Sequence, residues 1–487
     1  MASLSTMTPP APTVGAPALS AWDLARTAIE QARRQDTKTV LVLGFTAPVG
    51  DPVVWLSRHH GIPAMYWRGR DGWEYAGLGA AHVIGGHGES AMRAAADEAA
   101  AFVRKHVIAE PAPAGRRPRF FGGFAFDPHQ TDRGPWRDSS FGDAALILPE
   151  ALYVRRDTQS YMFFAFEVTP RTTSETLVDR LALFNQRYWG GFAGECPAGP
   201  RIAVDEEGTD AARDAWLASV RDVLRRIDAG DFVKTVIAHC QPVAIQSPNS
   251  GALDPWPVVR RLRDFDASCY HFGFQYDERF AFLGASPERL LRWSGGRLES
   301  EAIAGTVVRG VDPASDQARA EQLLASAKDQ HEHRVVVDAV RDALRRLAAS
   351  DSPDPVAQLE LSRLRTLTHL RSAMAVDLRS GVTPGQMLEA LHPTPAVAGT
   401  PRAAALAIIR AVEAIPRGWY AAPVGWIGAD SAEFAVAIRS ALLGVERGWL
   451  YAGAGLVRGS VPDNEWCEIQ DKLSAFHSAV HPAEPQP

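Results

Sequence analysis

The helix expected near the C-terminal end of the chain carries two carboxylates and a lysine along one stripe. Glu465, Glu468 and Lys472 follow one another at steps of three and then four residues. Two carboxylates one turn apart suit a hard, oxygen-seeking cation such as Mg²⁺. The same spacing fits a solvated helix face with a Glu468–Lys472 ion pair worth about 0.2–0.5 kcal/mol. On spacing alone the solvated face is the better interpretation.

A second long helix contains the run Lys-Asp-Gln-His-Glu-His from Lys328 to His333. Glu332 is a candidate third carboxylate for a metal, in surroundings that neighbouring apolar residues predict to be partly buried for His331 and Glu332. The alternative is an exposed Lys328–Glu332 pair at i,i+4, which local evidence favours. His331 and His333 lie on different helix faces, so they make a poor zinc pair.

Lys234 lies inside the apolar run Phe-Val-Lys-Thr-Val-Ile-Ala-His, which predicts a strand. Burial in such a strand disfavours a charged ammonium, and a neutral lysine is a usable general base. An edge-strand lysine that reaches solvent is an equally good interpretation.

Glu288 follows a strand in the run Phe-Leu-Gly-Ala-Ser-Pro-Glu-Arg. Pro287 ends ladder pairing, so Glu288 is expected at a strand end. A desolvated glutamate there would keep its proton and serve as a general acid. A surface salt bridge with Arg289 or Arg292 is the alternative, and it is favoured when Glu288 is considered alone.

Glycines and an arginine in strand-like runs predict a place for an anionic ligand. Gly305, Gly453 and Gly455 weaken a strand unless something approaches the backbone closely, and their bare N–H groups suit a carboxylate. Arg439, in an otherwise apolar run, is expected to bind a carboxylate bidentately. No phosphate-binding loop, dinucleotide fingerprint or nucleophile elbow is visible.

The elements that must position these residues are short strands, hairpins and separate long helices, which indicate an α+β fold rather than regular βαβ alternation. A hairpin is expected around Gly295 and Gly296. Helices are expected at about 21–34, 210–229, 319–348 and 462–479, and strands at 39–45, 232–239, 282–285, 424–426, 434–443 and 449–457. We expect a disordered tail at 1–20, an N-terminal α+β part at 21–205 and a catalytic region at 206–482.

The composition is that of an ordinary soluble globular protein. The 487 residues are 46% hydrophobic and 22% charged, with a net charge of −6, which gives no support for nucleic-acid binding. No apolar run is long enough to span a bilayer, and the N-terminus lacks the basic start of a signal peptide. The four cysteines make no disulfide framework, so a cytoplasmic location is expected.

Ten motifs occur in an order that resembles the chorismate-utilising family, which includes isochorismate, salicylate, anthranilate and aminodeoxychorismate synthases. The resemblance covers about residues 210–476 and implies large antiparallel sheets flanked by helices, as in anthranilate synthase component I. The motifs are FVKTVIAH, FLGASPERLL, EAIAGTVVRG, KDQHEH, LTHL, HPTPAVAGTP, PVGW, AIRSALL, YAGAG and PDNEWCEIQDK.

The resemblance implies roles that the isolated motifs do not decide. Lys234 matches the lysine that activates water, and Glu288 matches the acid that protonates the departing hydroxyl. The implied Mg²⁺ ligands are Glu332, Glu465 and Glu468. The implied substrate-binding positions are Gly305, Thr306, His369, Ala396, Arg439, Tyr451, Gly453, Gly455 and Lys472. One departure is His239, where the family usually has arginine; alternation places it away from Lys234, so we expect a change either in packing or in the residues that support the site from behind.

Within the family, several features favour an isochorismate synthase. Lys234 suits water as the nucleophile, salicylate synthases tend to carry threonine near Ala396, and Pro-Val-Gly-Trp at 423–426 resembles the isochorismate form. Salicylate synthase is the runner-up; anthranilate and aminodeoxychorismate synthases fit less well, and a catalytically silent binding subunit is a different class. The expected partners are chorismate and isochorismate, without an obligatory glutaminase subunit, in a monomer or weak homodimer serving menaquinone or siderophore biosynthesis.

Overall fold

The computed structural model describes residues 21–109, 118–128, 130–204, 209–247 and 252–480. The tail expected at 1–20 lies outside these residues. In the described part of the chain, no helix combines the length and the apolar character needed to cross a bilayer.

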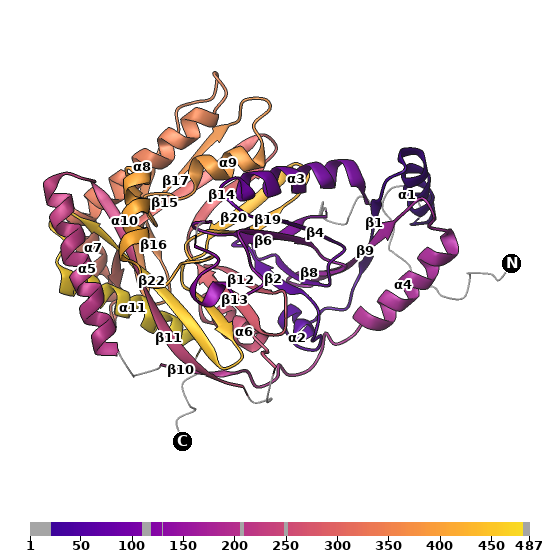
Figure 1. The fold of residues 1–487 in the computed structure, drawn as a ribbon, viewed down its shortest axis with the longest axis horizontal. Coiled ribbons are helices and arrows are strands. Elements are labelled where there is room, and N and C mark those ends of the chain that lie inside the picture. The colour runs from indigo at the N-terminus through magenta and orange to yellow at the C-terminus, as the bar shows by residue number, and fades with distance from the viewer. Residues whose placement is uncertain (1–20, 110–117, 129, 205–208, 248–251, 481–487) are drawn as a thin grey trace.

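A 13-stranded sheet forms one layer (Figure 1). Its ladders are antiparallel except for the parallel pair at its end, β1 with β5. In spatial order its strands are β10 (Arg201–Val204), β11 (Lys234–Gln246), β22 (Arg447–Val457), β21 (Ser440–Gly444), β13 (Phe280–Ser286), β12 (Tyr270–Gln275), β2 (Ala64–Arg68), β3 (Glu74–Leu78), β8 (Ala151–Arg156), β9 (Gln159–Val168), β1 (Thr39–Thr46) and β5 (Val107–Ala109), and β18 (Gly399–Thr400) pairs with β11.

A nine-stranded antiparallel sheet forms the other layer. Its strands in order are β16 (Gln358–Arg363), β17 (Leu367–Asp377), β15 (Arg297–Val308), β14 (Arg289–Ser294), β20 (Ser431–Val436), β19 (Pro423–Ile427), β6 (Phe120–Phe124), β7 (Ala144–Leu148) and β4 (His82–Gly86). The core between the layers is aromatic: the Trp419 ring lies 6.1 Å from that of Phe282 on β13, and it would lie 2.9 Å from a Cβ placed on Gly123 of β6.

Both sheets join the N-terminal part of the chain to the catalytic region. In the larger sheet β2 pairs with β12, and in the smaller sheet β6 pairs with β19. The parts expected on either side of residue 205 therefore share their sheets and a common core.

Helices cover the outer faces (Figure 1). Helices α5 and α11 pack on β22, whereas α8 packs on β15 and β17. The helices are α1 (Ala21–Gln35), α2 (Pro52–Leu56), α3 (Ala91–His106), α4 (Ser174–Tyr188), α5 (Thr209–Ala229), α6 (Trp256–Phe265), α7 (Pro313–Ala325), α8 (Ala327–Leu347), α9 (Pro384–Leu391), α10 (Arg402–Val412) and α11 (Pro462–Val480), and Gly134–Trp136 forms a 3₁₀ turn, η3. The predicted α+β class with large antiparallel sheets is confirmed.

Two predicted elements are wrong because the chain turns within them. The helix expected at 319–348 is divided at Ser326, whose extended backbone ends α7 and whose hydroxyl accepts from Asp329 N to begin α8. The strand expected at 434–443 is divided into β20 and β21, which belong to different sheets. Arg439, in a left-handed conformation with φ 52°, lies at the crossing and not within a strand.

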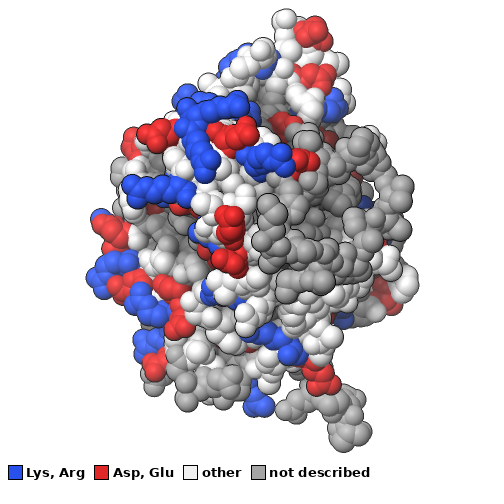
Figure 2. All heavy atoms as spheres, turned by 90° about the vertical axis from the view of Figure 1, so that its right-hand side faces the viewer, with Lys and Arg blue, Asp and Glu red and all other residues white. Residues whose placement is uncertain are grey.

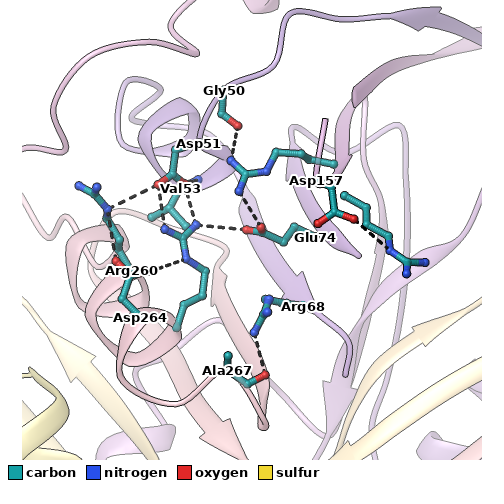
Figure 3. Close-up of polar contacts among 12 residues, drawn as sticks. Gly50, Asp51, Val53, Arg68, Glu74, Asp157, Arg260, Asp264 and Ala267 are labelled. Carbon is teal, nitrogen blue, oxygen red and sulfur yellow. Dashed lines mark hydrogen bonds and ion pairs between the residues drawn. The ribbon is translucent and has the colours of Figure 1, made fainter. Parts of the chain in front are cut away.

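A network of partly buried charges, the Arg263 network, fastens α6 to β3 and to the start of α2 (Figure 3). Arg263 donates bidentately to Asp51, with both distances 2.8 Å, and also donates to Glu74 at 3.1 Å. Tyr66 and Arg155 contact the other faces of the Glu74 carboxylate, at 2.7 and 3.2 Å. Each carboxylate oxygen in this network has a partner, so the network holds the two parts of the chain rigidly together.

On the face shown in Figure 2, basic and acidic side chains are intermixed over the described residues. Such a mixture gives no extended field of one sign. The view agrees with the absence of a basic stripe in the sequence.

Candidate active site

One cavity between the two sheets gathers nearly all of the predicted site residues. About 780 Å³ of space there, including open solvent at its mouth, is not filled by protein atoms. The predicted residues that line it are Glu288, Gly305, Thr306, Glu332, His369, Ala396, Arg439, Tyr451, Gly453, Gly455, Glu468 and Lys472. Lys234 and Glu465 lie in the walls behind this lining.

Lys234 begins β11, an interior strand, and its side chain is fully buried. The edge-strand interpretation is therefore wrong. Its ammonium lies 3.0 Å from Glu332 Oε1 on α8. Burial raises the pKa of Glu332, but Lys234 more than offsets it, so this pKa is below its ordinary value.

Glu288 lies between β13 and β14, as Pro287 predicts, and is 2% exposed. Its Oε1 has no hydrogen-bond partner in the protein, and Arg289 pairs with Glu299 instead, so the surface salt bridge is wrong. Burial, reinforced by Glu301 and opposed by Lys234, raises the pKa of Glu288 to about 8. At neutral pH this carboxyl keeps a proton and faces the cavity as a donor.

The three predicted metal carboxylates each hold a lysine. Besides the Lys234–Glu332 pair, Lys328 Nζ lies 2.6 Å from Glu465 Oε1, and Lys472 Nζ lies 2.7 Å from Glu468 Oε1. The i,i+4 pair on α11 does form, but its two members line the cavity. The alternative i,i+4 pair of Lys328 with Glu332 on α8 does not form, because the Lys328 ammonium reaches Glu465 on α11 instead. His331 is exposed, contrary to the prediction that it is partly buried.

Among the described residues, no three acidic, histidine or cysteine side chains converge at metal-ligand spacing. The three carboxylates nevertheless act on one ammonium. Burial lowers the pKa of Lys328, but Glu465, Glu332 and Glu468 raise it further, so the net shift is upward. The Lys328 ammonium therefore lies where the negative potentials of the three carboxylates add. Their oxygens are hard donors, which suit a divalent cation such as Mg²⁺.

Gly455 lets a helix side chain reach the sheet. A Cβ at this position of β22 would lie 2.3 Å from Glu332 Oε1 and 3.3 Å from Lys234 Cε. Any larger residue would push the carboxylate away from the lysine. On the same strand the Gly453 carbonyl accepts from Lys472 at 2.7 Å, so these two glycines shape the wall by close approach.

Arg439, His369 and Thr306 form a chain of contacts along another wall. Arg439 Nη2 lies 2.6 Å from His369 Nε2, and His369 Nδ1 lies 3.0 Å from Thr306 Oγ1. Burial and Arg439 hold the pKa of His369 well below its usual range. Since arginine is only a donor, Nε2 must accept and Nδ1 carries the proton. The neutral imidazole thereby orients Arg439 at the cavity.

The Tyr451 ring stacks on Tyr420 with centroids 5.0 Å apart. The Tyr451 hydroxyl accepts from Trp136 Nε1 at 3.0 Å and donates to the Pro416 carbonyl at 3.2 Å. Tyr420 was not predicted, and no periodicity or spacing marks it. Tyr451 therefore presents a ring face to the cavity while the protein engages its hydroxyl.

The chain as a whole matches a family model described as chorismate binding enzyme, over residues 27–481. The chain belongs to the chorismate binding enzyme family. The predicted resemblance is thus confirmed, and it extends well before residue 210.

This chorismate binding enzyme is 34% identical to the salicylate biosynthesis isochorismate synthase of Pseudomonas aeruginosa over 93% of the chain and 92% of that protein. It is 30% identical to the isochorismate synthase MenF of Escherichia coli, over 88% of the chain and 90% of that protein. A solved structure of the menaquinone-specific isochorismate synthase from Escherichia coli matches with a TM-score of 0.74 and 26% identity, covering 94% of the chain and all of that structure.

The anthranilate synthase component I structure from Streptococcus pneumoniae matches with a TM-score of 0.56 and 20% identity over 91% of the chain and 92% of that structure. This match shows the fold alone, and it confirms the predicted likeness of this chorismate binding enzyme to that architecture.

In this chorismate binding enzyme His239, which stands where the family usually has arginine, packs against a helix. His239 lies edge-on against Trp466 of α11, with ring centroids 5.0 Å apart. Burial lowers the pKa of His239 to about 4, so the ring is neutral. Its nearest ring contact lies on the predicted apolar face of α11, which agrees with the expected packing change.

Proposed function

We propose that this enzyme is an isochorismate synthase, which converts chorismate reversibly to isochorismate. The observation that carries the proposal is the Glu288 carboxyl, buried and without a partner on Oε1, in a cavity lined by Arg439 and Lys472 and backed by the buried Lys234. A dianionic substrate fits the cationic groups Arg439 and Lys472, and a departing hydroxyl needs the proton that Glu288 holds. The similarity to named isochorismate synthases over most of both chains supports the same reaction.

In the proposed reaction a water oxygen bonds to C2 of the substrate ring while the C4–O bond breaks and the ring double bonds shift. Lys234 accepts the proton of the attacking water, and Glu288 donates a proton to the leaving hydroxyl, which departs as water. One water enters and one leaves, so chorismate and isochorismate are isomers. In the reverse direction the same two groups exchange their acid and base roles.

Lys234 faces Glu332 in the structure, and an ammonium held in that pair has no lone pair with which to accept a proton. We infer that Lys234 acts as a base only when the Glu332 carboxylate no longer pairs with it. Glu332, Glu465 and Glu468 would hold Mg²⁺, which when bound supplies positive charge to a substrate carboxylate. The proposed base and the proposed metal site thus share Glu332.

The P. aeruginosa relative is named for salicylate biosynthesis and the E. coli one for menaquinone. Both names share isochorismate synthesis, which is the reaction that we infer for this enzyme.

Chromatography of chorismate incubated with enzyme and Mg²⁺ tests the proposal. We expect isochorismate without ammonium, the same equilibrium mixture from either side, and one ¹⁸O atom in the product formed in H₂¹⁸O. Chelation with EDTA should stop turnover, and added Mg²⁺ should restore it. Stoichiometric salicylate with pyruvate would instead identify a salicylate synthase, and a requirement for ammonium would identify an amine-transferring member of the family.

A further inference from the structure

The backbone just before Glu288 is held by an arginine from the N-terminal part of the chain. Arg70, which follows β2, donates through Nη2 to the carbonyl of Pro287. The same guanidinium donates to both oxygens of Glu301, at 3.1 and 2.9 Å, and lies over the Tyr270 ring at 4.8 Å. A planar guanidinium held on two edges and one face has little freedom to turn.

Glu301, on β15, is a fixed anchor for this arginine. It is 1% exposed and contacts three arginines, since Arg371 lies at 2.6 Å and Arg289 at 3.4 Å in addition to Arg70. Burial raises the pKa of Glu301, but Arg371, Arg70 and Arg289 together lower it to about 2. The anchor therefore remains an anion at neutral and mildly acidic pH.

Backbone contacts, and no contact of Oε1, hold Glu288. Its N–H donates to Ser286 Oγ at 3.2 Å and its carbonyl accepts from Val436 N at 3.1 Å, whereas its Oε1 has no partner. Pro287 lines the cavity beside it. The direction of the carboxyl is thus set by the backbone, and Arg70 is the side chain that fastens the preceding carbonyl.

We propose that Arg70 is a positioning residue for the acid: anchored by Glu301, it holds the Pro287–Glu288 segment so that the Glu288 carboxyl points into the cavity. The inference rests on the proposed function in taking Glu288 as the proton donor. It also gives the N-terminal part of the chain a share in catalysis, although Arg70 lies far outside the motifs of the catalytic region.

The charges around Glu288 make the role measurable. After burial, the groups that act on the pKa of Glu288 are Lys234, Arg70 and Lys472, which lower it, and Glu301, which raises it. Replacing Arg70 by methionine removes one cation and leaves Glu301 less neutralised. Both changes raise the pKa of Glu288, so the acid keeps its proton to higher pH.

The test compares wild type with Arg70→Met, and with Arg68→Met as the matched control. Arg68 ends β2 two residues earlier and donates to the Ala267 carbonyl (Figure 3), away from Pro287. For Arg70→Met we expect kcat to fall about 10- to 100-fold, as for a displaced catalytic group, and KM for chorismate to change less than threefold. The alkaline limb of the pH–rate profile should move to higher pH. Arg68→Met should keep the wild-type kcat and limb.

An infrared difference spectrum between each protein and its Glu288→Gln derivative reports the protonated carboxyl without any substrate. We expect the titration of this band to move to higher pH in Arg70→Met. A wild type that forms no isochorismate would overturn the proposed function, whereas an unmoved band overturns the role of Arg70. A kcat within twofold of wild type also overturns it. Should Arg70→Met not fold, the kcat of Arg70→Lys decides: we expect a three- to tenfold loss with an unmoved band, because lysine keeps the cation but not the planar fork, and a kcat within twofold of wild type overturns the role.

Discussion

The two charge clusters of this enzyme, the Arg263 network and the cavity, differ in how completely their carboxylates are paired. In the Arg263 network every oxygen of Asp51 and Glu74 has a partner (Figure 3). In the cavity, Glu288 Oε1 has none, and Lys234 Nζ has an ion-pair neighbour but no well-aligned hydrogen bond. Buried polar groups are nearly always satisfied, and the Glu288 carboxyl is an exception that lines the cavity, so we expect a substrate group to satisfy it.

The largest effect on the cavity cluster is expected from removing the proposed base, Lys234. In Lys234→Ala we expect turnover to fall about 10²–10⁴-fold, because general base catalysis contributes about that much, while chorismate still binds. Product formation and equilibrium binding measure the two effects. The exposed Lys38, paired with Glu167 at 3.2 Å, gives a control variant, Lys38→Ala, with wild-type turnover. Wild-type activity in Lys234→Ala would show that Lys234 is not the base.

Removing the centre of the Arg263 network should cost stability and not catalysis. In Arg263→Met the carboxylates of Asp51 and Glu74 lose their shared partner, and breaking a buried pair in this way costs about 3–5 kcal/mol. Urea unfolding measures the free energy, and turnover per folded molecule should equal that of wild type. The exposed Arg225–Asp222 pair supplies the control, Arg225→Met, for which we expect a loss below about 1 kcal/mol. An equal loss in the two variants would contradict the distinction.

The unsatisfied acid should make stability depend on pH. The pKa of Glu288 is about 8 when folded and ordinary when unfolded, so between these values the folded state binds the extra proton. Its contribution to stability is therefore full below the unfolded pKa and is lost as pH rises through the folded one. Relative to Glu288→Gln, wild type should lose about 1.4 kcal/mol per pH unit between pH 5 and 8. Urea unfolding at pH 5.5 and 7.5 checks this, and a constant difference would refute it.

The smallest effect is expected at His239, which is near the site but belongs to neither cluster. A neutral ring against Trp466 is replaced without loss of charge in His239→Phe, so turnover should change less than twofold and stability by less than about 1.5 kcal/mol. Product formation and thermal unfolding measure both. A large loss of turnover would assign His239 to the catalytic set.

The sequence predicted the position of single site residues better than the contacts between residues far apart in the chain. The strand-end position of Glu288 followed from Pro287, and the apolar face of α11 followed from its spacing. The pairing of Lys328 with Glu465 joins two helices 137 residues apart, and helical periodicity carries no information on such distances. Arg70 was missed for the same reason, because its contact with Pro287 depends on the pairing of β2 with β12.

Arg439 shows the other limit. Its apolar neighbours predict a strand, and strands do flank it, but they belong to different sheets. The left-handed backbone at Arg439 depends on the tertiary crossing and not on a glycine or asparagine that would mark a turn. Local pattern therefore singled out a residue that lines the cavity while placing it in the wrong conformation.

The position of β22 has a consequence for synthesis of the chain. This last strand lies between β11 and β21 in the larger sheet, so the sheet stays divided until about residue 457 has left the ribosome. Until then β11 and β21 each present an open edge, which is a template for pairing with another chain. In the nascent protein these two strand edges therefore stay open to pairing with other chains until the C-terminal segment has been synthesised. Slow translation of that segment should increase aggregation.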